Sequence, residues 1–570
     1  MTIASYRCLL LIAAAISLLL SACKEKEKTA AVSIAPADID LKRGALIACG
    51  PADKEYGSVN FASSCSEATQ KDFNLGIAML HSFEYDEAEK AFAKVIDADP
   101  NCAMAYWGVA MSNFHQVWPS PPTDHELAKG SNAVEKARSL ASGSVNMDYI
   151  NTIGAFYKDH ANYTQRERIL NYAKAMKEMY SNYPTDKEVA IFYALSLTSS
   201  ADPADKTYSN QKKAGDILNS LYPGQPNHPG VVHYIIHSYD SPELASMALD
   251  AARKYAAIAP SSAHAQHMPS HIFTRLGLWE ESIRSNLAAK ASAICYAESA
   301  GIKGHWDEEL HTVDYLVYAY LQKGENKLAK EQVDYLGSFT TVTPVTFKVF
   351  YSFAAAPSRY YLENKMWKEA ATLEMQPNFP WEKYPWQEAI IHFTRVIGLS
   401  NLGNVAEAKV ELTKLSEMHA ALKAQKDDYK ANLVMIQIKT AEAWLAFAGG
   451  KKEEAIIQMK AAAEMEDKTE KSPVTPGEVL PARQLLADML MLVDKHGEAL
   501  TAYEADLKKH PNRFNSLYGA ALASEQTNDK GKAKKYYQQL TTVASSPEAD
   551  RIEIVKAKEK LRGVMVDTRL

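Results

Sequence analysis

The stretch Gly76-Ile77-Ala78-Met79-Leu80-His81-Ser82-Phe83-Glu84-Tyr85-Asp86-Glu87-Ala88-Glu89-Lys90-Ala91-Phe92, which continues to Asp99-Pro100, predicts a helix–turn–helix unit. The small residues Gly76 and Ala88 let the two helices approach closely, and Phe92 fills the space between them. Pro100 ends the second helix, because proline lacks an N–H donor and clashes with the preceding turn. The unit can therefore be stacked on further copies of itself.

The same spacing recurs along the chain. Residues 513–541 carry Ala521, Ala533 and Tyr537 in the same frame, and weaker copies cover most of residues 67–547. This pattern resembles the tetratricopeptide repeat (TPR), which has small residues at positions 8 and 20, an aromatic residue at 24 and proline at 32 of a 34-residue unit. The resemblance implies an all-α, TPR-type α-solenoid in which each unit buries the apolar face of the next. The whole chain is similar to bacterial TPR lipoproteins, which implies an architecture and no particular activity.

Composition agrees with a folded solenoid. The 570 residues are 47% hydrophobic and 23% charged, which excludes a disordered chain. The formal net charge is −6 and no basic stripe stands out, so the sequence does not favour nucleic acid as a partner. The resemblance to TPR proteins implies a protein or peptide partner instead.

The N-terminus indicates export. Arg7 precedes an apolar stretch, residues 8–20, that is shorter than a typical transmembrane helix and is typical of a secretory signal. The tetrapeptide Leu20-Ser21-Ala22-Cys23 resembles a bacterial lipobox. This resemblance implies removal of residues 1–22, a lipid (palmitate) anchor on Cys23 and a tether over residues 23–48. Because residue 24 is Lys and not Asp, the resemblance favours the outer membrane, facing the periplasm. The alternative is an ordinary signal peptide with an incidental cysteine.

Export permits disulfides. Cys49 and Cys65 lie close together in a cap segment, residues 49–68, that precedes the first clear repeat. We expect a Cys49–Cys65 bridge to hold this cap, with a stabilisation of about 3 kcal/mol. Cys102 and Cys295 are expected to be buried, unreactive side chains. Beyond the cap we expect an N-terminal array at 69–341, an aromatic-rich connection at 342–385, a second array at 386–547 and a capping helix with a tail at 548–570.

Histidines mark a candidate site in the first array. The separations His233 to His267 and His237 to His271 are both 34 residues, the length of one repeat. In TPR proteins the corresponding positions, together with that of His264, line the concave groove. Residues three or four apart share one helix face, and imidazole suits Zn, Cu, Ni and Fe. We therefore predict a ligand-binding or metal-binding site, with zinc as one possible ion, and the full candidate set is His233, His237, His264, His267, His271, His311, Asp314 and Asp240.

Other interpretations of the groove stay open. Arg275 and Arg359 fall on the same face, and their guanidinium groups suit an anionic ligand or a peptide carboxylate. The histidines are also compatible with polar residues that simply line a groove, or with a metal-dependent enzyme, although no nucleophile–base pair is visible. Pro269 lies inside the predicted helix, so this helix either begins near Pro269 or is kinked there.

Overall fold

The computed structural model describes residues 39–50, 56–115, 117, 121–203, 205–470 and 474–567. The predicted signal sequence, Cys23 and most of the predicted tether lie outside these residues. The described part is all helical, with no β-strand beyond an isolated bridge between His305 and Val342. This confirms the predicted fold class. None of its helices is both long and apolar enough to cross a membrane.

The α-helices of the first half are α2 (Gln70–His81), α3 (Tyr85–Ala98), α4 (Ala103–Ser112), α5 (Asp124–Leu140), α6 (Ser144–Tyr157), α7 (Gln165–Asn182), α8 (Lys187–Ser199), α9 (Ser209–Leu221), α10 (Pro229–Ser238), α11 (Leu249–Ile258), α12 (Ala263–His267), α13 (Pro269–Arg275) and α14 (Trp279–Ser299). Those of the second half are α15 (Asp307–Gln322), α16 (Asn326–Gly337), α17 (Phe347–Glu363), α18 (Trp367–Ala371), α19 (Pro385–Asn401), α20 (Val405–Ala424), α21 (Asp428–Ala448), α22 (Lys452–Asp467), α23 (Ala482–Met491), α24 (His496–Lys509), α25 (Phe514–Gln526), α26 (Lys530–Val543) and α27 (Ile552–Asp567). Short 3-10 helices are η2 (Glu67–Thr69), η3 (His160–Asn162), η4 (Tyr222–Gly224), η5 (Ala245–Ala248) and η6 (Trp381–Lys383).

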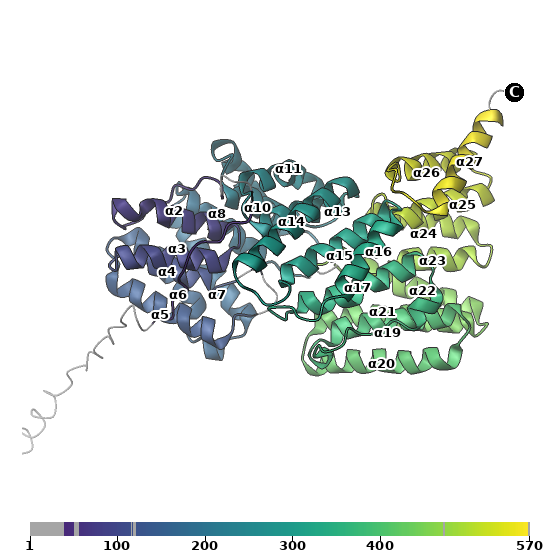
Figure 1. Ribbon diagram of the computed structural model, residues 1–570, viewed down its shortest axis with the longest axis horizontal. Helices are drawn as coiled ribbons and strands as arrows, with labels where there is room; N and C mark the ends of the chain where they lie inside the picture. The colour runs from purple at the N-terminus through teal and green to yellow at the C-terminus, as the bar shows by residue number, and fades with distance from the viewer. Residues whose placement is uncertain are drawn as a thin grey trace, which may run out of the picture.

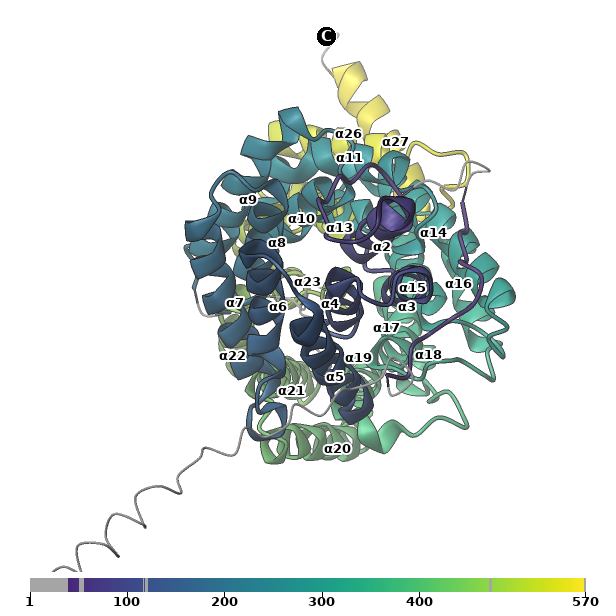
Figure 2. The ribbon, with the colours of Figure 1, turned by 90° about the vertical axis from the view of Figure 1, so that its left-hand side faces the viewer.

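Successive helices pack as hairpins, beginning with α2/α3 and α4/α5 and ending with α25/α26, on which α27 packs. Figure 1 shows the hairpins following one another along the long axis, from purple at one end to yellow at the other. Seen along that axis, they wind around a common centre (Figure 2). Each hairpin buries its apolar face against the next, as expected of a solenoid.

Distant parts of the winding touch one another. Helix α10 contacts α2, and α15 contacts α25. The indole N–H of Trp279 donates to the Asn512 carbonyl at 3.0 Å, and the Phe514 amide donates to the Gln322 side chain at 3.0 Å. The Tyr296 hydroxyl donates to Glu87 at 3.1 Å. Segments far apart in the sequence are therefore in contact along the solenoid.

The hydrophobic core consists of two clusters that meet after α13. The first extends from Ile39 to Phe273, and the second begins at Trp279. Pro269 lies at this boundary and begins α13, directly after α12, while Met268 between them keeps helical angles of φ −54 and ψ −35. His264 and His267 lie inside α12 and helical angles continue through Met268, so of the two geometries expected for Pro269 the structure has the one in which a helix is interrupted at the proline.

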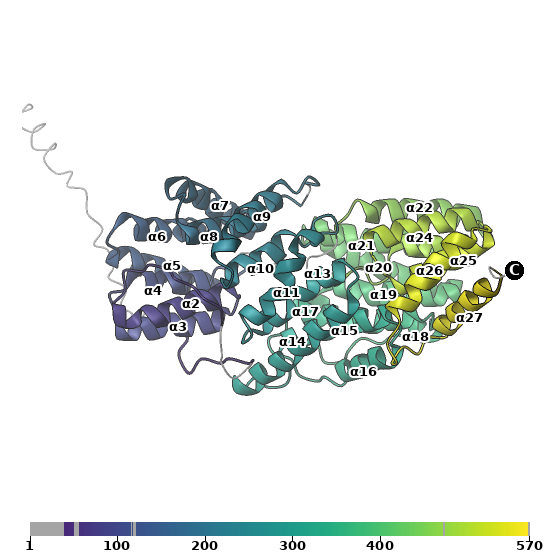
Figure 3. The same cartoon turned by 90° about the horizontal axis from the view of Figure 1, so that it is seen from above.

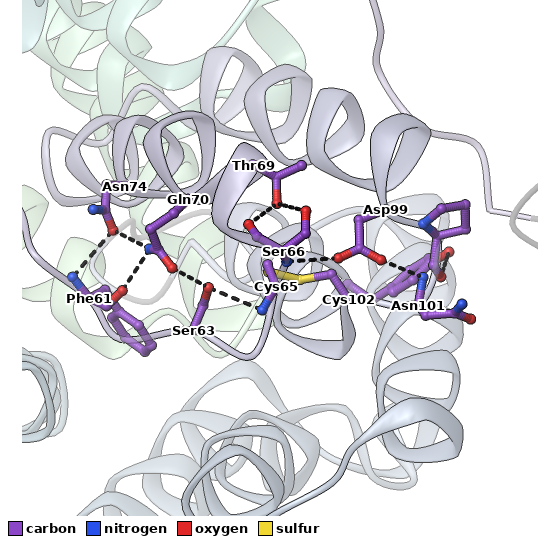
Figure 4. Close-up of a disulfide and its surroundings, with 12 residues drawn as sticks. Phe61, Ser63, Cys65, Ser66, Thr69, Gln70, Asn74, Asp99, Asn101 and Cys102 are labelled. Atoms are coloured by element: carbon purple, nitrogen blue, oxygen red, sulfur yellow. Dashed lines mark hydrogen bonds between the residues drawn. A yellow bond between two sulfur atoms is a disulfide. The ribbon is translucent and has the colours of Figure 1, made fainter.

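The expected Cys49–Cys65 bridge is wrong, and Cys102 and Cys295 are not free thiols. Cys49 pairs with Cys295, and Cys65 pairs with Cys102. The cap segment crosses the first repeats, so its two cysteines meet different neighbours. Next to Cys65, the Ser66 amide donates to Asp99 at 2.9 Å and brings the start of α2 against the turn before α4 (Figure 4).

Candidate metal centre

Three histidines meet where α10 passes α12. We call His233, His237 and His264 triad A. Nε2 of His233 lies 3.1 Å from Nε2 of His237 and 3.2 Å from Nε2 of His264. Nε2 of His233 therefore faces the Nε2 atoms of both His237 and His264. His233 and His264 are buried and His237 is nearly so.

The tautomer of His233 follows from its other nitrogen. Nδ1 of His233 lies 2.6 Å from the carbonyl oxygen of His81, which can only accept a hydrogen bond. Nδ1 therefore carries the proton in neutral His233, and its Nε2 presents a lone pair to the centre of triad A. The His81 ring is held in turn by Tyr234 at 2.9 Å and Glu188 at 3.0 Å.

A second group, triad B, consists of His267, His271 and His311. His267 ends α12, His271 lies on α13 and His311 lies on α15, and Figure 3 shows α13 and α15 in the middle of the molecule. Nε2 of His267 is 3.1 Å from Nε2 of His271. In each triad the three histidines can offer one nitrogen apiece with all three atoms within 4.8 Å of one another.

Two Nε2 atoms of triad B face each other. His267 Nδ1 donates to the Asn286 amide oxygen at 2.7 Å, and Asn286 is oriented by its own donation to the Ser282 carbonyl at 2.8 Å. His271 Nδ1 donates to Asp240 at 2.9 Å. The Nε2 atoms of both rings therefore face each other across 3.1 Å, an arrangement in which one metal ion can bind both.

Burial disfavours protonation of four histidines of the two triads. Burial lowers the pKa of His233, His264 and His267 well below the usual value. Burial, helped by the nearby His271, lowers the pKa of His237 to about 3. A tetrahedral ion with metal–nitrogen distances of about 2.0–2.1 Å holds its nitrogens about 3.3–3.4 Å apart. The separations of 3.1 and 3.2 Å come within a few tenths of an ångström of that requirement.

The predicted carboxylates do not join either triad as ligands. Asp240 accepts from His271 Nδ1, on the side of the ring away from triad B, and from Arg275 Nε at 2.8 Å. It orients a ligand, as carboxylates behind metal-bound histidines do. Asp314 forms a buried ion pair with Arg359. These two ion pairs engage Arg275 and Arg359, the arginines that the anionic-ligand alternative requires.

The 34-residue register places the histidines on the expected helices but divides them between two groups. His233 and His237 belong to triad A, whereas His267 and His271 belong to triad B. His264 and His267, three residues apart on the short helix α12, contribute to different triads.

A further cluster was not indicated by the sequence. His81, Glu188 and His228 come from three separate hairpins, with no spacing that relates them. His81 Nε2 and His228 Nε2 both donate to the Glu188 carboxylate, at 3.0 and 2.9 Å. Burial alone would raise the pKa of Glu188, but the two histidines lower it below its usual value. These nitrogens carry protons directed at a carboxylate, so the cluster is a hydrogen-bonded support for the His81 segment.

Comparisons with known proteins concern the fold. Residues 514–547, which include α25 and α26, match the tetratricopeptide repeat family model. No curated protein matches the sequence. Similar solved structures include the APC/C hetero-tetramer Cut9–Hcn1 (12% identity, 87% of this chain and 96% of that chain, TM-score 0.26) and Naa15/Naa10 bound to HypK-THB (11%, 87% and 96%, 0.21). A human IFIT1 dimer with m7Gppp-AAAA is also similar (11%, 82% and 95%, 0.33). The chain therefore contains a tetratricopeptide repeat at residues 514–547 within its series of stacked hairpins, and such repeats generally bind protein partners.

Proposed function

We propose that this chain is an exported, lipid-anchored TPR protein that binds one transition-metal ion in triad A and one in triad B. The observation that carries the proposal is the 3.1 Å gap between Nε2 of His267 and Nε2 of His271. Because Asn286 and Asp240 accept hydrogen bonds from Nδ1 of His267 and His271, the Nε2 atoms of both rings face this gap, where one metal ion can bind both. Neutral imidazole nitrogens of this kind are ligands for Zn, Cu, Ni and Fe.

The two disulfides support the export part of the proposal. Both cross-links join segments far apart in sequence, with separations of 246 and 37 residues. Structural disulfides persist in oxidising compartments such as the bacterial periplasm. A protein partner, which tetratricopeptide repeats generally bind, would dock on the surfaces of the repeats.

Metal analysis of protein purified without a histidine tag tests the proposal. We expect two ions per chain. His237→Ala with His264→Ala should remove one ion, and His271→Ala with His311→Ala should remove the other. His125→Ala is the matched control, because His125 is exposed and lies outside both triads. Metal-free parent protein, or equal loss from the control variant, would contradict the proposal.

A further inference from the structure

The turn between α2 and α3 has a conformation that recurs along the solenoid. The Phe83 amide donates to the Leu80 carbonyl at 3.1 Å, and the Glu84 amide donates to the Met79 carbonyl at 3.0 Å. The turns at Gly324, Gly403 and Gly450 form the same pair of hydrogen bonds. In each turn the first of the two donors is a residue with positive φ, which satisfies the last carbonyls of a helix.

Phe83 is a bulky aromatic residue in this position. Its φ is 58°, and the corresponding places are filled by glycine at residues 277, 324, 403 and 450, by asparagine at 528, by aspartate at 494 and by lysine at 365 and 426. Glycine and asparagine tolerate the left-handed conformation, and a bulky aromatic residue does not. Local strain of this kind tends to persist where a side chain has a function. Glycine would relax the backbone of this turn, so what the Phe83 side chain contributes lies in the contacts of its ring.

The ring of Phe83 covers triad A. Its centroid lies 4.4 Å from that of His233 and 5.4 Å from those of both His237 and His264. Phe83 is itself only 8% exposed. Tyr255 stacks on His233 with the centroids 4.8 Å apart. A single aromatic ring therefore packs against all three imidazoles of triad A.

Triad A also differs from triad B in charge. The partner of His233 Nδ1 is a neutral carbonyl, whereas His271 in triad B donates to the Asp240 carboxylate. The carboxyl group adjacent to Phe83, that of Glu84, accepts from Ser262 at 2.6 Å. An ion in triad A would therefore be held by three neutral nitrogens in an aromatic enclosure.

We infer that triad A is a closed, three-coordinate site for monovalent copper and that Phe83 determines this selectivity. The inference rests on the metal binding proposed above. Zinc almost always takes four ligands in protein sites. A divalent ion also costs more to bury than a monovalent ion when no anionic ligand compensates its charge. Exclusion of the fourth ligand by Phe83 thus disfavours zinc and favours the cuprous ion.

The test uses full-length protein in which His271→Ala and His311→Ala remove triad B. Cuprous ion and Zn²⁺ are titrated separately against competing chelators. Phe83→Gly, which relaxes the turn and admits water, should lower the ratio of cuprous to zinc affinity by about tenfold or more. Phe83→Asn is a second variant that removes the aromatic ring. Asparagine fits this turn, because Asn528 occupies the equivalent position elsewhere in the chain.

The control is Lys365→Gly, which relaxes the same kind of turn, at φ 54, between α17 and α18. It should leave the affinity ratio unchanged. If both Phe83 variants still bind metal with an unchanged ratio of cuprous to zinc affinity, the role of Phe83 is overturned while the metal binding of triad A stands. A background protein that binds neither ion would overturn both this inference and the proposed metal binding at triad A.

Discussion

At the residue scale, the candidate site depends on which nitrogen of each imidazole carries a proton. The 34-residue spacing predicts that His233, His237, His267 and His271 lie on equivalent helix faces, and in the structure these four residues are divided between triad A and triad B. The sequence cannot indicate the partners of the Nδ1 atoms. The carbonyl of His81 comes from a distant hairpin and reaches His233 only because α2 contacts α10. The way in which distant helices pack therefore determines which three histidine rings converge.

Asp240 should position His271 for metal binding. Asp240→Asn keeps the size of the side chain but removes the charge that faces His271 Nδ1. We expect the metal affinity of triad B to fall by about 10–100-fold, as for other supporting residues of metal sites, while triad A is unaffected. Chelator competition on the triad-specific variants measures both affinities. Asp250→Asn, at an exposed carboxylate, is the control; a loss of similar size in that variant would contradict the positioning role.

His510 should make stability depend on pH. Burial alone would lower its pKa, but Asp506 at 2.8 Å and Glu478 at 3.0 Å raise it to about 9. Because the folded pKa exceeds the unfolded value of about 6.5, the stabilisation is complete below about pH 6.5. It is lost as the pH rises through about 9. The difference in free energy of unfolding between the parent and His510→Gln should therefore shrink from pH 6 to pH 10. Denaturant titrations at both pH values test this, and a constant difference would refute it.

At the scale of helices and turns, repeat spacing was sufficient to predict the hairpins, because small residues, aromatic residues and proline fix where two helices can meet. The match at residues 514–547 covers one of the clearest predicted repeats. The path of the cap segment could not be predicted from the sequence. A segment without a hydrophobic core of its own takes its position from contacts with helices that come much later in the chain. Cys49 donates its amide to the Ser261 carbonyl at 3.4 Å and bonds to Cys295, both far away in sequence.

The Cys65–Cys102 bridge should stabilise the first hairpins. It closes a loop with a sequence separation of 37 residues, for which the chain-entropy estimate is about 4 kcal/mol. Cys65→Ser with Cys102→Ser should lower the free energy of unfolding of this end of the solenoid by an amount of that order. Limited proteolysis during a denaturant titration would show that the loss of stability is located near α2. Peptide mapping without reductant should recover the two observed pairs, and a Cys49–Cys65 peptide would contradict them.

At the scale of the whole molecule, triad B lies where the two halves of the core meet. The helices that carry His267 and His271 pack on the first hydrophobic cluster, and α15, which carries His311, packs on the second. An ion in triad B would link the halves, in addition to contacts such as Trp279 with Asn512. The sequence predicts a long array, but the contact between successive windings depends on the curvature summed over many hairpins.

The proposed anchor belongs to this scale as well. Cleavage before Cys23 and lipidation of its thiol would leave the solenoid attached to a membrane by its N-terminus. We expect the exported protein to have the mass of a chain beginning at lipidated Cys23 and to partition into detergent. Cys23→Ser should release it into the aqueous phase. A product cut elsewhere, or a variant that stays with the membrane, would contradict the lipid anchor.

The central claim, that two buried histidine triads each hold a metal ion, is tested most directly by anomalous X-ray diffraction from crystals of tag-free protein. Data collected above and below the absorption edge of the bound metal should show two peaks. Each should lie about 2.0–2.1 Å from the Nε2 atoms of one triad. Peaks elsewhere, or none at either triad in crystals grown with added copper and zinc, would contradict the account.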